Sequence, residues 1–200
     1  MNIVIIGSGG REHALCYKLL KSSKINKIYC IPGNAGTDEI ATNIFADIND
    51  FDEIYKIVLR LNVELIVVGP EIPLVNGIVD YFEKKNINIF GPNKKCSQLE
   101  GSKFFMKNIC KKYNIPSAKY FEISDINQIE KFLSSVSFPV VVKSDGLAAG
   151  KGVTICNNLD EVIKDVQEIL DGKFKSSNKV FIEEFLAVSY THLTLPTTPV

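Results

Sequence analysis

Four short apolar runs divide the first ninety residues, and helical spacing of apolar residues fills the intervals between them. The predicted strands are residues 2–6, 27–31, 65–68 and 87–90, and the predicted helices are residues 13–20, 51–61 and 75–85. Glycine or proline follows each apolar run, as at the end of a strand. Strands that alternate with helices in this way favour a parallel sheet with right-handed crossovers.

The pattern changes after Pro92, where a cationic amphipathic helix is predicted over residues 102–113. From residue 119 onward the turns are shorter, which favours antiparallel pairing. The predicted strands there are 119–121, 140–143, 153–156 and 180–185, with helices at 126–133 and 159–170. The predicted fold is α/β: a Rossmann-like parallel-sheet domain at 1–100, a linker helix region at 101–118 and a small α+β lobe at 119–186.

The last fourteen residues, AVSYTHLTLPTTPV, carry no charged side chain and continue no strand or helix pattern. We expect the native sequence to stop near Leu186 and residues 187–200 to be a non-native tail. His192 lies in this tail, so His13 is expected to be the only native histidine.

Composition limits the class of function. Lysine and arginine number 23, equal to aspartate and glutamate, so a general role on nucleic acid or on a membrane surface has no electrostatic support. No cationic leader precedes the first apolar run, and no apolar segment approaches the length needed to cross a bilayer. The five cysteines include no CxxC pair. These features predict a cytoplasmic protein with free thiols and no disulfide framework.

The first glycine-rich turn, Gly7-Ser-Gly-Gly10, follows the first strand and opens a helix. Glycines there allow backbone N–H groups at a helix N-terminus to approach an anion. A dinucleotide fingerprint requires a third glycine, where this chain has Glu12, and an acidic residue after the second strand, where it has Pro32. A nicotinamide-dependent dehydrogenase is therefore disfavoured.

The second glycine-rich turn, GLAAGKG, fails as a Walker A loop. Its glycines are one residue too close, Gly152 replaces the required Ser or Thr, and a strand is predicted after it where a P-loop enters a helix. We predict a hairpin flap that folds over a triphosphate, with a plain surface turn as the alternative. Lys143 ends the strand before it, where it is either solvated at the sheet edge or a point charge for a phosphate.

Several segments together resemble the glycinamide ribonucleotide synthetase family of ATP-grasp enzymes. They are GSGGREHAL, PGNAGT, VGPEIPLVNGIVD, IFGP, LEGSKFFMK and KSDGLAAGKGV, and the resemblance runs in order through residues 1–186. Ser144 departs from the alanine common in the family, with no functional consequence expected. The resemblance implies that ATP phosphorylates the glycine carboxylate and that the amine of 5-phosphoribosylamine attacks the glycyl phosphate. The products are glycinamide ribonucleotide, ADP and phosphate.

The resemblance also implies site residues. For ATP they are Lys103, Lys143, Gly146, Leu147, Ala148, Ala149, Gly150, Lys151, Gly152, Glu183, Glu184, Phe185 and Leu186, with Lys143 and Lys151 as catalytic cations. The last four form the adenine hinge. Gly9, Gly10, Arg11 and Glu71 match the region that faces the ribosylamine phosphate and amine. Three simpler readings stay open: Glu71 as a helix cap, His13 as a packed helix residue, and Asn34 as a residue that orders a turn.

The family uses ATP with Mg²⁺ or Mn²⁺, and the resemblance places the metal ligands beyond residue 186. We therefore expect this chain alone to lack ligase activity and to bind ATP weakly at most. The expected partners are ATP, glycine and 5-phosphoribosylamine, with no nucleic acid, no membrane and a monomeric state. The alternatives are a non-catalytic nucleotide-binding fragment or another ATP-grasp carboxylate–amine ligase, such as a biotin carboxylase.

Overall fold

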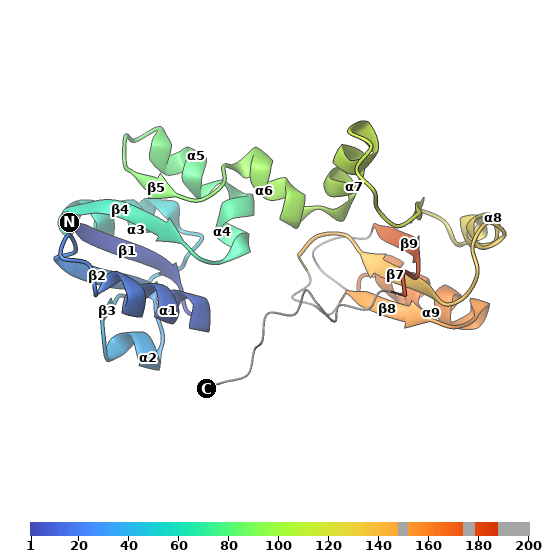
Figure 1. Ribbon diagram of the computed structural model, residues 1–200, viewed down its shortest axis with the longest axis horizontal. Helices are drawn as coiled ribbons and strands as arrows, with labels where there is room; N and C mark the ends of the chain where they lie inside the picture. Colours follow the sequence, from blue (N-terminus) through green and yellow to red (C-terminus); the bar gives the residue numbers. More distant parts are fainter. Residues whose placement is uncertain (148–151, 174–178, 188–200) are drawn as a thin grey trace. The chain divides into compact units, whose positions relative to one another are not determined.

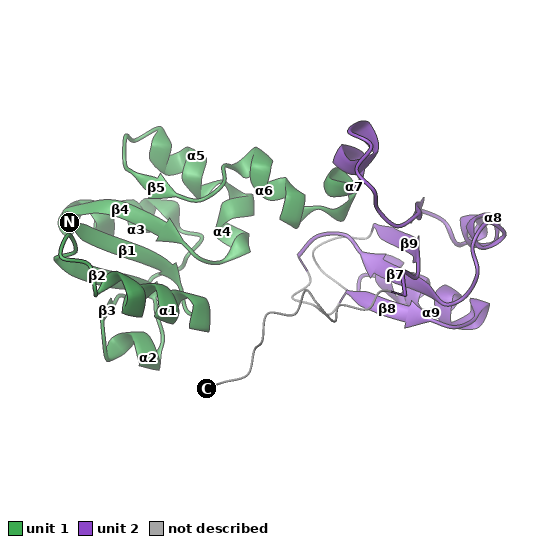
Figure 2. Ribbon diagram, viewed as in Figure 1, with its two compact units in different colours: residues 1–106 green, residues 107–200 purple. Residues whose placement is uncertain are grey.

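The computed structural model describes residues 1–147, 152–173 and 179–187. The chain divides into two compact units, Met1–Met106 and Lys107–Val200 (Figure 2). The division falls inside a helix, six residues beyond the end of the first predicted domain, and each unit is described by itself.

Unit 1 is built on a parallel sheet of five strands in the order β3-β2-β1-β4-β5 (Figure 1). The strands are β1 (Asn2–Gly7), β2 (Lys27–Pro32), β3 (Thr42–Asn43), β4 (Val63–Val68) and β5 (Ile89–Phe90). All four pairings are parallel, which confirms the predicted α/β class. The two-residue strand β3 was not predicted, because Thr42-Asn43 has no apolar run to signal it.

Helices cover both faces of this sheet. The helices of unit 1 are α1 (Gly10–Leu19), α2 (Ala35–Asp38), α3 (Phe51–Arg60), α4 (Glu71–Asn76), α5 (Ile78–Glu83), α6 (Lys94–Gly101) and the start of α7 (Lys103–Lys112). Of these, α1, α3 and α5 contribute side chains to the clusters on the two faces of the sheet. Alternate residues of β1 point to opposite faces. Val4 packs in the cluster that contains Ile54 of α3 and Phe82 of α5, whereas Ile5 packs with Cys16 of α1. The central strand is thus buried on both sides.

Three helix predictions needed correction. The predicted helix 75–85 is two helices, because Gly77 has a left-handed φ of +99° that ends α4 and allows α5 to start. Helix α1 begins at Gly10, three residues before the predicted start, because the glycine turn itself enters the helix. Helix α6 was not predicted; the Asn93 side chain caps it by accepting from the Cys96 amide at 2.9 Å.

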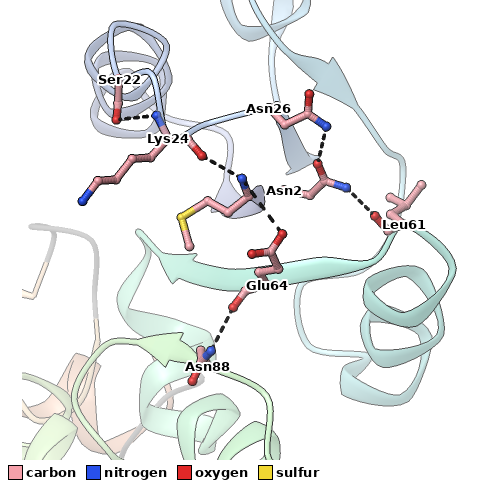
Figure 3. Close-up of polar contacts among 8 residues, drawn as sticks. Asn2, Ser22, Lys24, Asn26, Leu61, Glu64 and Asn88 are labelled. Atoms are coloured by element: carbon pink, nitrogen blue, oxygen red, sulfur yellow. Dashed lines mark hydrogen bonds and ion pairs between the residues drawn. The ribbon is translucent and has the colours of Figure 1, made fainter.

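Side chains close the amino-terminal end of the sheet (Figure 3). The Met1 ammonium donates to the Lys24 carbonyl at 2.7 Å, and the Asn2 amide donates to the Leu61 carbonyl at 2.9 Å. Asn88 donates to the Glu64 carbonyl at 3.1 Å. These bonds satisfy the carbonyls of Lys24 and Leu61, which precede β2 and β4, and the carbonyl of Glu64 near the start of β4.

Unit 2 contains an antiparallel sheet of four strands in the order β6-β9-β7-β8. The strands are β6 (Tyr120–Ile123), β7 (Val140–Ser144), β8 (Val153–Cys156) and β9 (Val180–Glu184). The helical segments are η1 (Ile126–Gln128), α8 (Ile129–Leu133) and α9 (Leu159–Leu170). Val162 and Val166 of α9 share a buried cluster with Val142. The antiparallel α+β arrangement confirms the prediction. Within the described ranges, no helix combines the length and the apolar character needed to span a membrane.

Candidate functional site

The first candidate region lies at the carboxyl ends of β1 and β4 in unit 1. Strand β1 has β2 on one side and β4 on the other, so the chain leaves the centre of the sheet in opposite directions (Figure 1). Ligands of doubly wound sheets bind at such a switch point. We call Gly9, Gly10, Arg11, Glu12 and Glu71, which gather at this edge, the sheet-end cluster.

The Glu12 side chain binds the backbone of the glycine turn. Its side chain is buried, and Oε2 accepts from the Gly9 amide at 2.5 Å. A Cβ on Gly69, at the end of β4, would lie 1.9 Å from Glu12 Oε1, so glycine is required for the close approach. Among the described residues, Oε1 has no hydrogen-bond partner. The sequence reading treated Glu12 only as a missing glycine; its place three residues after the helix cap was the available signal.

Arg11 and Glu71 form the exposed part of the sheet-end cluster. The Arg11 guanidinium donates to Glu71 Oε1 at 2.9 Å, and both side chains are more than 40% exposed. A hydrogen bond from its own backbone amide, and then Arg11, hold the pKa of Glu71 below its ordinary value. Glu71 is the first residue of α4, whose N-cap is Pro70, and its carboxylate pairs with Arg11. A capping role for Glu71 stays a prediction. The Gly9 amide is occupied by Glu12, whereas a Cβ at Gly10 would meet open space.

Asn34 and His13 have structural surroundings. Asn34 Oδ1 accepts from the Thr37 amide at 2.9 Å and caps α2, and its Nδ2 donates to the Ser8 carbonyl at 2.8 Å. It therefore orders the turn and ties it to the glycine turn. His13 is half-buried, and its ring would lie 3.4 Å from a Cβ placed on Gly36. Both observations agree with the simpler readings.

The second candidate region, in unit 2, is a buried charge cluster. Glu183 on β9 accepts from Lys143 of β7 at 2.7 Å and lies 3.3 Å from the ammonium of Lys107 on α7. The side chains of Glu183 and Lys107 are 5% and 4% exposed, and that of Lys143 is 28% exposed. The Lys107 ammonium also donates to the Ala118 carbonyl at 3.2 Å and lies 5.2 Å from the ring centre of Tyr120.

This cluster carries one negative and two positive charges. Its formal net charge is therefore positive and would attract an anion. Lys143, the more exposed of the two lysines, is the cation that a phosphate can reach. Lys107 was missed by the sequence reading. Lys103, which was predicted, stands one helical turn earlier in α7, and its part of that helix belongs to unit 1. The spacing of four residues on one helix was the signal that would have pointed to Lys107.

The predicted adenine hinge follows the end of β9. Glu184 Oε1 accepts from the Lys119 amide at 2.9 Å, and the Glu184 amide donates to the Lys119 carbonyl at 3.0 Å. Both hinge carboxylates are thus paired: Glu183 with Lys107 and Lys143, and Glu184 with the backbone of Lys119, which precedes β6. Phe185 and Leu186 are exposed beyond the strand end.

The glycine-rich turn joins β7 to β8. Lys143 pairs with Val153 in antiparallel register, and the Ser144 amide donates to the Gly152 carbonyl at 2.9 Å. The turn is therefore a hairpin, as predicted, and not a P-loop. Gly146 has a left-handed φ of +80°, and Leu147 follows it. Ala148, Ala149, Gly150 and Lys151 lie outside the described residues.

Two further features of the described residues bear on the site: the surroundings of Ser144 and the distribution of possible metal ligands. Ser144 is fully buried, and its hydroxyl donates to the Asp145 carbonyl at 3.2 Å, so the serine is accommodated locally. Across residues 1–147, 152–173 and 179–187, no three His, Cys, Asp or Glu side chains gather as metal ligands. The carboxylates nearest Lys143 are already paired, so the described residues do not supply a divalent-metal site.

The two sheets and the glycine-rich hairpin define an ATP-grasp protein. Residues 101–194 match the model "Phosphoribosylglycinamide synthetase, ATP-grasp (A) domain", and residues 1–100 match the N domain of the same enzyme. The chain belongs to the phosphoribosylglycinamide synthetase family.

Named relatives agree with this assignment. The chain is 41% identical to a phosphoribosylamine–glycine ligase of Caldanaerobacter subterraneus subsp. tengcongensis over 93% of its length, and 44% identical to a bifunctional purine biosynthetic protein of Dictyostelium discoideum over 92%. It covers 45% and 23% of those proteins. The crystal structure of phosphoribosylamine–glycine ligase from Thermotoga maritima superposes with a TM-score of 0.74 at 32% identity, covering 94% of this chain and 45% of that one. The chain thus spans less than half the length of these relatives.

Proposed function

We propose that this chain forms the sugar-phosphate-binding domain and the first ATP-binding lobe of a phosphoribosylamine–glycine ligase. The whole enzyme would join glycine to 5-phosphoribosylamine through glycyl phosphate, and would release ADP and phosphate. The observation that carries the proposal is the Lys107–Glu183–Lys143 cluster at the base of a glycine-rich hairpin, in a chain whose two halves match the two domain models of this family.

In unit 2, Lys143 would neutralise charge on the triphosphate as the γ-phosphoryl group leaves for the glycine carboxylate. A preorganised cation in a partly dry site stabilises such developing charge more than water does. Glu183 holds the Lys143 ammonium at 2.7 Å in place before nucleotide arrives. Gly146, Leu147 and Gly152, with the turn residues Ala148–Lys151, would cover the phosphates and exclude water from the acyl phosphate.

The adenine would lie against the backbone of Phe185 and Leu186, because the side chains of Glu183 and Glu184 are already bound. A nucleotide contact for Lys103, on the part of α7 that belongs to unit 1, stays a prediction. The whole enzyme would use Mg²⁺ or Mn²⁺ to neutralise phosphate charge, but the described residues do not form a site for such an ion. Two solved neighbours were obtained with ADP, a biotin carboxylase domain with MgADP and an N5-carboxyaminoimidazole ribonucleotide synthetase, and at 18% and 22% identity they share the fold alone.

In unit 1, the sheet-end cluster would bind 5-phosphoribosylamine. Arg11 would exchange its bond with Glu71 for a bidentate contact with the phosphate, which is the geometry that guanidinium groups favour. Glu71, freed from Arg11, would accept from the amine. Gly9 and Gly10 would allow the sugar phosphate to approach the backbone.

Binding of ribose 5-phosphate by the purified chain tests this assignment. Arg11→Gln removes a charge-assisted contact of roughly 1.5–3 kcal/mol, so the dissociation constant should rise about ten- to a hundredfold. Arg60→Gln is the matched control, because Arg60 is the one other arginine in the sequence and lies at the end of α3. Equal affinity of wild type and Arg11→Gln contradicts the assignment.

We also propose that these 200 residues by themselves do not turn substrate over, since the chain covers 45% of the ligases it matches. Glycine-dependent ADP formation by the purified chain contradicts this part. The monomeric state, the cytoplasmic location and the lack of nucleic-acid partners stay predictions. So do the end of the lobe near residue 186 and the non-native tail at 187–200. The second family model matches as far as residue 194. The relatives give no support to a different ATP-grasp ligase, because those at 38–44% identity are a bifunctional purine biosynthetic protein and phosphoribosylamine–glycine ligases.

A further inference from the structure

Two cysteine thiols meet inside unit 1. Cys16 lies on α1 and Cys30 on β2, and their sulfur atoms are 3.1 Å apart. Both side chains are fully buried, in the apolar cluster that contains Ile3, Ile5 and Ile28. The remaining cysteines are Cys96, Cys110 and Cys156; Cys96 is exposed, Cys110 is half-buried, and Cys156 is buried in unit 2.

The geometry brings the two sulfur atoms within about 1 Å of bonding distance, because a disulfide bond is about 2.05 Å long. Cys16 is held by helix α1, and Cys30 is held by the parallel pairing of β2 with β1, where it lies opposite Ile5.

The two thiols also differ chemically. The hydrogen bond between them lowers the pKa of Cys16, whereas that bond and burial raise the pKa of Cys30. Since the thiolate is the form that attacks an oxidant, Cys16 is the nucleophile and Cys30 is the resolving thiol. Glu12 is the nearby charged group that opposes ionisation of both.

We propose that Cys16 and Cys30 form an oxidation site, at which a peroxide converts the two thiols to an intramolecular disulfide. The Cys16 thiolate attacks one peroxide oxygen, the O–O bond breaks, and a sulfenic acid and one water form. The Cys30 sulfur then attacks the sulfenic sulfur, the S–O bond breaks, and a second water leaves. Two thiols are oxidised by two electrons in total, and one peroxide is reduced to two waters.

The crosslink joins the two elements that lead into the sheet-end cluster. Helix α1 begins at Gly10 and carries Arg11 in its first turn, and β2 runs into the turn that Asn34 orders. The disulfide closes a short loop between them and limits local opening of this edge. Because both thiols are buried, the oxidant enters only when α1 opens locally, so the reaction is slow compared with that of an exposed thiol. The oxidation site does not rest on the proposed function.

The test is differential alkylation of the full chain after exposure to hydrogen peroxide, followed by peptide mapping. The reduced protein should alkylate at five cysteines after denaturation, and the oxidised protein at three, with a Cys16–Cys30 crosslinked peptide that dithiothreitol releases. Cys156→Ser is the control, because it removes a buried thiol from the other unit and should leave the crosslink intact. Cys16→Ser and Cys30→Ser should each abolish it.

Peptide mapping of the wild-type protein tests whether the Cys16–Cys30 disulfide forms, even if these serine variants fold poorly. Five free thiols after prolonged exposure, a crosslink that joins other cysteines, or sulfinic acid at Cys16 without a crosslink each overturn the proposal.

Discussion

Removing the buried carboxylate of Glu183 should destabilise unit 2. In Glu183→Gln, Lys107 keeps its bond to the Ala118 carbonyl and its contact with Tyr120, but it loses its counter-charge at 3.3 Å. At an effective dielectric constant of about 20, the attraction lost over that distance is roughly 5 kcal/mol. Because the amide still donates or accepts one hydrogen bond, we expect a net loss of about 3–5 kcal/mol, as for other broken buried pairs.

Two further variants separate charge from packing. Lys107→Met leaves Glu183 paired with Lys143 and fills the site with an apolar chain, so its cost should be smaller, about 1–2 kcal/mol. The double variant Lys107→Met/Glu183→Gln leaves only the partly exposed Lys143 without its carboxylate, so it should be more stable than Glu183→Gln alone.

Hydrogen exchange of the β7 and β9 amides, followed by mass spectrometry, reports the stability of unit 2 separately from unit 1. A loss of 3 kcal/mol or more accelerates exchange through global opening by at least about a hundredfold. If Glu183→Gln exchanges within about fivefold of wild type, or if the double variant is the least stable of the three, the cluster does not contribute through charge compensation and the reasoning is wrong.

Two other predictions concern unit 1. Gly69→Ala places a Cβ 1.9 Å from Glu12 Oε1 and should cost about 1–3 kcal/mol of unfolding free energy in urea, whereas Gly10→Ala meets open space and should be neutral or slightly stabilising; equal effects would contradict the packing described. Burial and a hydrogen bond to Asp52 raise the pKa of Tyr81 to about 12, so one phenol should titrate near that pH in ultraviolet absorbance and be missing in Tyr81→Phe. The folded state holds this proton more tightly, so the stabilisation is complete below pH 10, the ordinary tyrosine value, and is lost as the pH rises through 12. Titration of that phenol near pH 10 would refute the contact.

Local signals were sufficient for much of the fold. Strand β8 and helix α9 have the predicted bounds, because Gly152 precedes the strand and Asn158 caps the helix by accepting from the Glu161 amide at 3.0 Å. The break at Gly77 was less visible, since glycine within a helical pattern is usually tolerated and only its backbone angle shows the interruption.

A site residue could be predicted from the sequence where it lies within a recognisable motif. It could not be predicted where its contacts depend on elements that are distant in the sequence. Arg11 and Glu71 come together because β1 and β4 are neighbours, which a parallel sheet allows but does not require. Lys107 looks in sequence like a solvated residue of a cationic helix. In the structure Lys107 is buried, and it contacts Glu183 of β9, Tyr120 of β6 and the Ala118 carbonyl. The pairing of Lys143 with Glu183 was likewise not predicted, and the contact of Lys143 with a phosphate stays a prediction.

The central claim is that Lys143 meets the phosphates of ATP, and the most direct measurement is an NMR titration that follows the lysine side-chain signals. We predict that ATP shifts the Lys143 signal and that Lys143→Met abolishes nucleotide binding, whereas the exposed-residue variant Lys131→Met in α8 binds as wild type. A Lys143 signal that does not move at saturating ATP, or a Lys143→Met variant with wild-type affinity, would contradict the account.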